Sequence, residues 1–443
     1  MLMMYRTLLS IALFGITLSV SHAQLLPTTV TRPLSDIRDL QPVDIRPSKP
    51  DIPLLSELLP PVTEHLTPAL EQALTPINTA LKLTANTLNA ETPLADINEA
   101  ITPNGQLVLE REWVIYVEEN DFSLNSHHDI EILEQQYLAA LQMWAVRLKV
   151  APHIDNLQQL KNSLQGVAIQ GVDRNHVYLT QAGSAAKIGT QQVTLSQCHS
   201  RQALRIGMLD SAINVSHPVF AGINVTESVF LEAGYPVSQA HGTAVAGVLS
   251  QAIPEEVSLK LFNAASFYAR NQVSQGASVF HLLKGLNWLG SQQVEVINMS
   301  LTGPANIMLE RALKSLYDSG ISLVAAVGNA GPAAPPLYPA AYKQVIGVTA
   351  IDANRQIYRW ANQGAQVAIA ARGVSVMTAR GINEMGAETG TSMAAPLVSA
   401  AVGCFSATND APGQLPAFLR QQLTDLGTPG WDPVFGHGAL LLN

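Results

Sequence analysis

The chain has 443 residues and a formal net charge of −9, and 13% of its residues are charged whereas 47% are hydrophobic. A chain of this length is too long to fold around one ordinary hydrophobic core, so we expect two or three structural units. Lysine and arginine form no run, which argues against nucleic acid or an anionic membrane surface as a partner. The two cysteines, Cys198 and Cys404, are too few for a disulfide scaffold or a cysteine-based metal site. We expect one bridge between them if the chain enters an oxidising compartment.

The N-terminal residues are typical of a secretory signal peptide. Arg6 supplies a positive charge, Leu8 to Val20 form an apolar stretch of 13 residues, and Ser21-His22-Ala23 offers a small-residue cleavage site. A membrane-spanning helix needs about 20 apolar residues, and no later segment is apolar over that length. The sequence therefore predicts a signal peptide over residues 1–23 and a secreted or periplasmic protein without a membrane span.

Residues 24–104 are predicted to form a linker or tail rich in proline, leucine and alanine. Its first part contains so many prolines that a helix cannot continue through it. Residues 62–101 contain short amphipathic helical patterns, which are interrupted by Pro68, Pro76 and Pro93. The sequence leaves the role of this tail open.

A small α/β sandwich is predicted over residues 105–182, and an exposed polar linker over residues 183–200. Strand and helix patterns alternate in this region within about 70 residues. The expected strands are 112–117, 144–150 and 172–179, and the expected helices are 128–137 and 157–164. Two interpretations are open at this point: an accessory binding domain, or a prodomain that helps the following domain to fold and inhibits it.

A long alternation of apolar strands and helices follows over residues 201–443. Strands are expected at 204–209, 257–262, 294–299, 322–327, 344–350 and 367–370, and helices at 242–251, 279–289, 307–318, 391–405 and 414–426. Continuous apolar strands between helices indicate a mostly parallel sheet with helices on both faces. The predicted fold class is therefore α/β with a doubly wound sheet, preceded by the small sandwich and the proline-rich tail.

Three polar residues stand at the ends of these predicted elements. Asp210 directly follows the buried strand 204–209, while His241 and Ser392 each begin a helix of small residues. Each residue alone has an ordinary explanation, namely a turn aspartate, a structural histidine and an N-cap serine. Together they stand in the order Asp, His, Ser at the edge of one parallel sheet, which is the order of one class of hydrolytic triad.

The residues around these positions resemble the subtilisin-like serine peptidases. The chain has D-S at Asp210, H-G-T at His241 and G-T-S-M-A-A-P around Ser392. Three further stretches resemble the same family: VINMSLTGP at 296–304, AAVGNAGP at 325–332 and DLGTPGWDPVFGHGALL at 425–441. The resemblance covers about residues 204–441, so the region 201–443 is identified as a peptidase domain of this type.

The resemblance implies a secreted serine endopeptidase that forms an acyl-enzyme. Ser392 is then the nucleophile, His241 the general base and Asp210 the residue that orients the histidine. The oxyanion hole would consist of the Ser392 backbone N–H and the Asn329 side chain. The edge that binds substrate as an added strand would consist of Ser300, Leu301, Thr302 and Gly303.

The resemblance also favours the prodomain interpretation of residues 105–182. The chain would then cut itself within about Gln181 to Arg201, and its partners would be its own prodomain and protein or peptide substrates. We expect a monomer without a cofactor or a metal centre. No Asp-rich loop indicates a calcium site, so the sequence leaves calcium binding open.

Two positions depart from the family pattern, and one rival function stays open. Ala212 replaces a glycine two residues after Asp210, so we expect a slightly different turn. Thr302 replaces a glycine and would narrow the substrate edge. An α/β-hydrolase esterase needs G-x-S-x-G and the order Ser, Asp, His, and a sedolisin-like peptidase has Glu in place of His241. A non-enzymatic binding protein on a peptidase scaffold is the alternative, although all four catalytic positions are occupied.

Overall fold

The computed structural model describes residues 97–118, 124–180, 194–196, 198, 203–271, 274–405 and 415–442. The chain divides into two compact units between Thr87 and Leu88, and every described residue belongs to the second unit. The predicted signal peptide, most of the predicted tail and most of the linker 183–200 lie outside the described residues. None of the helices described is long and apolar enough to cross a membrane.

A parallel sheet of eight strands forms the centre of the main body, residues 203–442. Its strand order is β18-β15-β14-β13-β11-β6-β8-β7, and every neighbouring pair is parallel. The strands are β6 (Leu204–Asp210), β7 (Asn224–Val229), β8 (Leu259–Ala265), β11 (Val296–Met299), β13 (Ser322–Ala326), β14 (Val345–Ile351), β15 (Ile369–Arg372) and β18 (Ala439–Leu440). The predicted doubly wound α/β fold is therefore confirmed.

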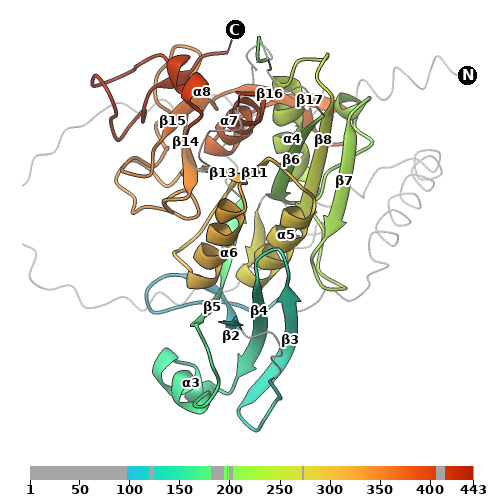
Figure 1. The fold of residues 1–443 in the computed structure, drawn as a ribbon, viewed down its shortest axis with the longest axis vertical. Coiled ribbons are helices and arrows are strands. Elements are labelled where there is room, and N and C mark those ends of the chain that lie inside the picture. The colour runs from blue at the N-terminus through green and yellow to red at the C-terminus, as the bar shows by residue number, and fades with distance from the viewer. Residues whose placement is uncertain are drawn as a thin grey trace, which may run out of the picture. The chain divides into compact units, whose positions relative to one another are not determined.

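Helices cover both faces of this sheet (Figure 1). On one face lie α4 (Ala240–Ala252) and α7 (Thr391–Phe405), and on the other α5 (Val279–Ser291) and α6 (Ile307–Asp318). Strand alternation explains the division, because Ile206 and Met208 of β6 pack in the core with α4 and α7 while Leu209 packs with α5 and α6. All 15 residues of α7 are buried, which the small side chains of this helix permit.

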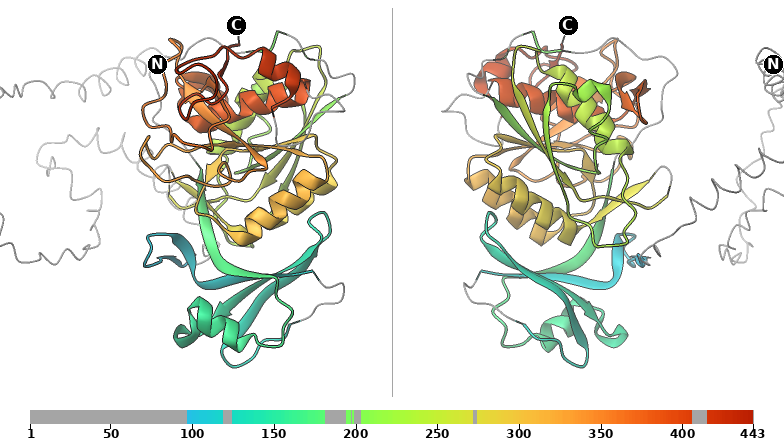
Figure 2. Two further views of the ribbon diagram at one scale, coloured as in Figure 1. Left: turned by 60° about the vertical axis from the view of Figure 1, so that its left-hand side comes forward. Right: turned by 90° about the vertical axis from the view of Figure 1, so that its right-hand side faces the viewer.

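Residues 97–180, which we call the N-terminal layer, contribute five strands to a second, antiparallel sheet of eight strands. The layer consists of β1 (Glu99–Ile101), β2 (Leu107–Val117), β3 (Ile130–Leu138), β4 (Met143–Val150) and β5 (Gly171–Thr180), with the helix α3 (Leu157–Ser163). Val114, Tyr116 and Leu138 of this layer share a hydrophobic core with α5 and α6. The two helices therefore pack between the two sheets (Figure 2).

Two predicted helices differ from the structure. Residues 128–137 were expected to be helical, but Ile130–Leu138 form the strand β3. A register shift between Ile132 and Glu134 interrupts the alternation of this strand, so its apolar residues mimic a helical period. The predicted helix 414–426 is reduced to α8 (Ala417–Gln421), and Thr424 instead forms a bridge with Ala439.

Several short strands were missed because they are too short or too polar to show a period. They are β1, β7, β9 (Tyr268–Ala269), β10 (Gln275–Ser278), β16 (Val376–Arg380), β17 (Glu384–Glu388) and β18, whereas β12 (Leu301–Thr302) lies in the segment 300–303 that was expected to bind substrate as an added strand. β16 and β17 pair as an antiparallel hairpin that leads into α7. β10 and β12 both pair with β5 of the N-terminal layer.

The expected bridge between Cys198 and Cys404 is present, with a Cα–Cα distance of 4.6 Å. It joins the segment before β6 to the end of α7. The neighbouring residues of this segment are also held by the main body, because Thr194 Oγ1 donates to the carbonyl of Gln251 (2.9 Å) and the Leu195 N–H to that of Ala252 (2.8 Å). Leu195 is buried in the core beneath α4 and α7. Thr194, Leu195 and Cys198 are thus fastened to the main body.

The bridge should stabilise the main body, since it closes a loop with a sequence separation of 206 residues. We expect the double substitution Cys198→Ser/Cys404→Ser to lower the free energy of unfolding by roughly 2–5 kcal/mol, measured by guanidinium denaturation. Wild-type protein unfolded in the presence of a thiol reductant is the control and should match the double variant. Two free thiols in unreduced wild type would contradict the bridge.

Candidate active site

The topology brings three loops together at one edge of the parallel sheet. The chain leaves the central strand β6 toward β8 and β7, and later continues on its other side with β11 and β13. Such a reversal of strand order opens a crevice at the carboxyl ends of the strands. Asp210 ends β6, Ser300 follows β11, and Asn329 lies three residues after β13. The predicted site residues from distant parts of the sequence therefore converge at this edge.

Asp210 and His241 form a buried hydrogen-bonded pair. His241 lies in the first turn of α4, and its Nδ1 is 2.8 Å from Oδ1 of Asp210. The exposed fractions of the two side chains are 4% and 1%. Donation from Nδ1 to the carboxylate leaves Nε2 as the ring nitrogen that can accept a proton. Within the described residues, Nε2 has no hydrogen-bond partner.

Ser211 fastens the Asp210 loop to the start of α4, a role that the sequence analysis missed. Its N–H donates to Oδ1 of Asp210 (2.7 Å), and its hydroxyl accepts from the Gly242 N–H (2.8 Å). A Cβ at Gly242 would lie 2.3 Å from the Ser211 carbonyl oxygen, so the glycine of H-G-T is needed for this approach. Ala212 is not among the residues with positive φ, so alanine is accommodated in this turn without strain.

Asn263 on β8 forms a hydrogen bond to the same loop. Its Nδ2 donates to the Ser211 carbonyl (2.9 Å) and to Oε2 of Glu227 on β7 (2.7 Å). The other hydrogen bond of that Glu227 oxygen comes from the N–H of Ile213 (2.7 Å). Burial raises the pKa of Glu227, although the bonds from Asn263 and Ile213 act in the opposite direction. These polar contacts hold the turn after Asp210 at Ser211 and at Ile213.

Ser392 lies in the first turn of α7 and is fully buried. The residue before it is held by Asn329, because Oδ1 of Asn329 accepts from both the N–H and the hydroxyl of Thr391, each at 3.0 Å. This arrangement commits the carbonyl end of the Asn329 amide to Thr391 and leaves its nitrogen as the donor end. Gly328 has φ +108, a conformation that favours glycine, so the G-N pair shapes this loop.

The residues of the predicted substrate edge, Ser300–Gly303, make three kinds of contact. Leu301 and Thr302 form β12, which pairs antiparallel with Thr180 and Leu179 of β5. Gly303 instead exchanges two backbone hydrogen bonds with Tyr338, at 2.8 and 3.0 Å. The hydroxyl of Ser300 donates to the carbonyl of Ser392 at 2.9 Å.

β5 of the N-terminal layer lies between two edges of the main body. On the side opposite β12, β10 pairs with it through Gly276↔Leu179 and Ala277↔Tyr178. Tyr178 is fully buried, and its hydroxyl donates to the Pro304 carbonyl. A Cβ at Gly303 would lie 2.5 Å from its ring, so this glycine makes room for the aromatic side chain. Burial also raises the pKa of Tyr178 well above its ordinary value.

A buried ionic cluster joins the N-terminal layer to the main body. Arg147 on β4 donates to both carboxylate oxygens of Glu112 (2.7 and 3.0 Å) and to Glu232 of the main body. His281 on α5 contacts the other Glu232 oxygen at 2.6 Å. Burial alone would raise the pKa of Glu232, but the hydrogen bond from His281 and the charges of His281 and Arg147 lower it to about 2.

A second polar contact across the same boundary involves His176 on β5. Its Nδ1 accepts from Nδ2 of Asn306 (2.9 Å), the N-cap residue of α6, and its Nε2 lies 3.2 Å from Oε1 of Gln106. His176 is buried, and burial lowers its pKa; Arg174 acts in the same direction and Asp173 in the opposite one. A neutral imidazole is needed here because a protonated Nδ1 cannot accept from Asn306.

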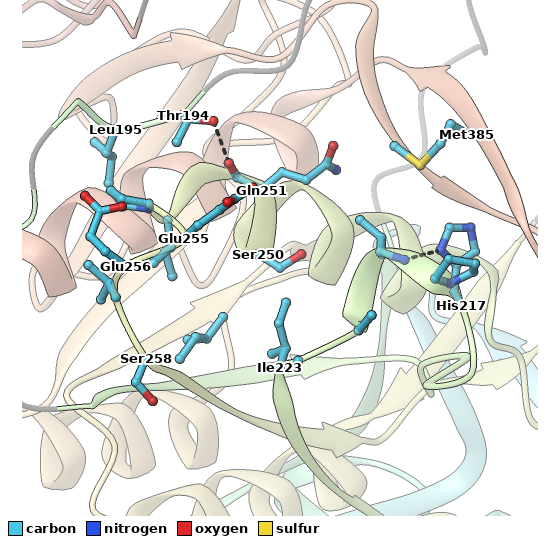
Figure 3. Close-up of a pocket in the computed structure, with 18 of the residues that line it drawn as sticks. Thr194, Leu195, His217, Ile223, Ser250, Gln251, Glu255, Glu256, Ser258 and Met385 are labelled. Atoms are coloured by element: carbon cyan, nitrogen blue, oxygen red, sulfur yellow. Dashed lines mark hydrogen bonds between the residues drawn. The ribbon is translucent and has the colours of Figure 1, made fainter.

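A cavity of about 1270 Å³ lies at the far end of α4 from His241 (Figure 3). Ser250 and Gln251 line it together with Glu255, Glu256 and Met385. Gln251 is ten residues after His241, or about 15 Å along the helix axis. The residues that line the cavity include none of Asp210, His241 or Ser392, so this cavity is not the candidate active site.

Comparison with known proteins relates this site to one family. The subtilase family pattern matches residues 201–438, more than half of the chain. The minor extracellular protease Epr of Bacillus subtilis (strain 168) is 28% identical over 289 residues, covering 62% of this chain and 44% of that protein. Subtilisin DY of Bacillus licheniformis is 33% identical over 246 residues, covering 54% of this chain and 89% of that protein.

Subtilisin E of Bacillus subtilis (strain 168) matches a longer part of the chain. It is 26% identical over 349 residues, which cover 76% of this chain and 90% of that protein. The chain thus spans less than half of the length of the Epr protease, but most of the length of the two subtilisins.

The buried His176 should lower the stability of the folded unit in mild acid. Because its pKa is lowered on folding, the unfolded chain takes up a proton as the pH falls through about 6.5 while the folded chain does not. We expect the free energy of unfolding to decrease below that pH, and His176→Gln to reduce this decrease, measured by urea denaturation between pH 7.5 and 5.5. His128→Gln, at a side chain that is 93% exposed, is the control. Identical pH dependences for wild type and His176→Gln would contradict this role.

Proposed function

The chain belongs to the subtilase family of serine endopeptidases, and we propose that it hydrolyses peptide bonds in proteins through Asp210, His241 and Ser392. The observation that carries the proposal is the buried hydrogen bond of 2.8 Å between Asp210 and His241. It lies at the sheet edge where the loops before α7 and after β13 also meet. The strand β5 pairs with β12, and this pairing supports a cleft that accepts an extended peptide.

In the proposed reaction, the Ser392 hydroxyl attacks the scissile carbonyl while Nε2 of His241 takes its proton. Asp210 keeps the imidazole in the tautomer with hydrogen on Nδ1 and stabilises the imidazolium that forms. The C–N bond then breaks, and the leaving amine receives the proton from Nε2, which gives an acyl-enzyme. A water molecule attacks the ester by the same route in reverse, releases the acid and restores the serine.

The negative oxygen of the tetrahedral intermediate needs donors that are already aimed at it. We assign this function to the backbone N–H of Ser392, at the positive end of the α7 dipole, and to the amide nitrogen of Asn329. The bonds from Thr391 to Oδ1 of Asn329 support this assignment, because they set the orientation of the amide before substrate binds.

We further propose that the unit predicted over residues 105–182 is a prodomain, which ends at Gln181 and whose last strand occupies the substrate cleft. β5 pairs with β12 through Leu179↔Thr302 and Thr180↔Leu301. A peptide that continues in this register brings its next residue opposite Ser300, whose hydroxyl contacts the Ser392 carbonyl. By this register the bond cut in maturation is the one between Gln181 and Ala182, which lies outside the described residues.

The fastening of Thr194, Leu195 and Cys198 supports a cut upstream of them. The predicted window for cleavage, Gln181 to Arg201, includes Thr194 and Leu195, whose hydrogen bonds to α4 keep this stretch on the main body. A cut before Thr194 also leaves Cys198 and Cys404 in one piece, so the prodomain separates without reduction of the bridge. We propose that the mature enzyme is secreted or periplasmic and acts on proteins or peptides.

The self-cleavage proposal is tested by comparing wild type with Ser392→Ala. Wild type should yield two pieces on a non-reducing gel, and N-terminal sequencing of the larger piece should begin at Ala182. Ser392→Ala should remain uncut, because the nucleophile is absent. Cleavage of purified Ser392→Ala at the same bond would show that another peptidase does the processing. Wild type that stays intact and active would make residues 105–182 an accessory domain.

The oxyanion assignment is tested with Asn329→Ala. We expect a fall in kcat of roughly 10²–10³ from the loss of one donor, measured on a peptide substrate and normalised to active sites titrated with a fluorophosphonate. Asn224→Ala, at an exposed position on β7, is the control and should keep wild-type activity. A kcat within threefold of wild type for Asn329→Ala would contradict the assignment.

A further inference from the structure

The helix that carries the proposed nucleophile contains a proline four residues after it. In an α-helix, each N–H donates to the carbonyl four residues earlier. The N–H that would serve the Ser392 carbonyl belongs to position 396, which is Pro396 and lies inside α7. Proline has no N–H, and its ring also presses against the carbonyl four residues before it. The Ser392 carbonyl therefore lacks the donor that an α-helix normally provides to it.

Ser300 supplies the missing hydrogen bond from a different element. Its hydroxyl donates to the Ser392 carbonyl at 2.9 Å, across 92 residues of sequence, and both residues are fully buried. A neighbouring side chain fixes the direction of this bond, because Nδ2 of Asn298 donates to Ser300 Oγ at 3.1 Å. The carbonyl oxygen of the Asn298 amide lies 3.0 Å from the hydroxyl of Ser399 on α7. A buried chain of hydrogen bonds thus runs from α7 through β11 and back to the first turn of α7.

We propose that Ser300 is a positioning residue for the nucleophile, an inference that rests on the proposed function. Ser392 is then held from both sides. Asn329 binds the N–H and the hydroxyl of Thr391, the residue before it, and Ser300 binds the carbonyl of Ser392 itself. Together the two contacts restrain the backbone on either side of Ser392, and hence the direction of its side chain.

The same short loop also carries the substrate edge. Ser300 directly precedes Leu301 and Thr302, the two residues of β12 that pair with β5. The hydroxyl of Ser300 therefore ties the nucleophile to the backbone that would hold the scissile peptide. Since both are attached to one loop, the distance between attacking oxygen and scissile carbonyl depends on one rigid support, and small misplacements there are costly to catalysis.

The first test is Ser300→Ala, which removes the hydroxyl and leaves the backbone pairing of the loop intact. We expect kcat to fall about tenfold, the loss typical of one buried hydrogen bond, while KM changes by less than about twofold. The values are taken on the protein as it is produced, per active site titrated with a fluorophosphonate. Ser250→Ala, which removes the hydroxyl bonded to the Gly247 carbonyl (3.1 Å) at the far end of α4, is the matched control.

The second test adds Pro396→Ala to Ser300→Ala. Alanine at 396 restores the backbone donor, so the Ser392 carbonyl is again satisfied, but by a bond along the helix axis instead of one toward Ser300. We expect the double variant to regain the free energy of unfolding that Ser300→Ala loses, measured by guanidinium denaturation, without regaining kcat. Recovery of kcat together with stability would mean that Ser300 only satisfies a buried carbonyl, and would overturn the positioning role.

Failure of this inference can be told apart from failure of the proposed function. A Ser300→Ala enzyme with wild-type kcat, in a protein that Ser392→Ala inactivates, would overturn the role of Ser300 and leave the peptidase assignment standing. A wild-type protein that neither cuts peptides nor reacts with the fluorophosphonate would overturn the proposed function itself.

Discussion

The rest of the structure depends on the complete burial of α7. A helix with all 15 residues buried must have small side chains where it meets the sheet and α4, because interiors are close-packed. The sequence provides Ala, Ser and Gly at these positions, so α7 can lie close enough to the sheet for its first turn to meet the ends of β11 and β13. The neighbouring helix α4 is similar, since Gly242 and Gly247 would each place a Cβ within 2.5 Å of other atoms. The edge of the sheet that carries the candidate site is thus formed by close helix–sheet packing.

Much of the fold was predictable where one strong period dominates. The helix 307–318 begins and ends at the predicted residues, because its apolar side chains recur at helical spacing and Asn306 caps it. The strand β3 was mistaken for a helix because its register shift after Ile132 hides the alternation. β10 was not predictable, since it is short and one of its two partners, β5, is distant in sequence. Local patterns contain no information about such partners.

The residues of the candidate site differ in how much of their role the sequence predicted. Short sequence motifs that resemble those of one family singled out Asp210, His241, Ser392 and Asn329. The supporting contacts of Ser211 and Asn263 were missed, since one serine after a strand and one asparagine within an apolar strand form no pattern. Ser300 was predicted to be part of a substrate edge, but its side chain is bonded to Ser392. The one local signal for that contact is Pro396, four residues after Ser392.

The bridge between Cys198 and Cys404 makes the stability of the main body depend on its chemical surroundings. It joins the strand at the centre of the sheet, through the segment before β6, to the end of the buried helix α7. A chain in a reducing compartment lacks this link and exposes its sheet and helix to separate fluctuations. The folded domain is therefore most stable under oxidising conditions, so that the redox state of its surroundings sets how firmly the buried helix is held.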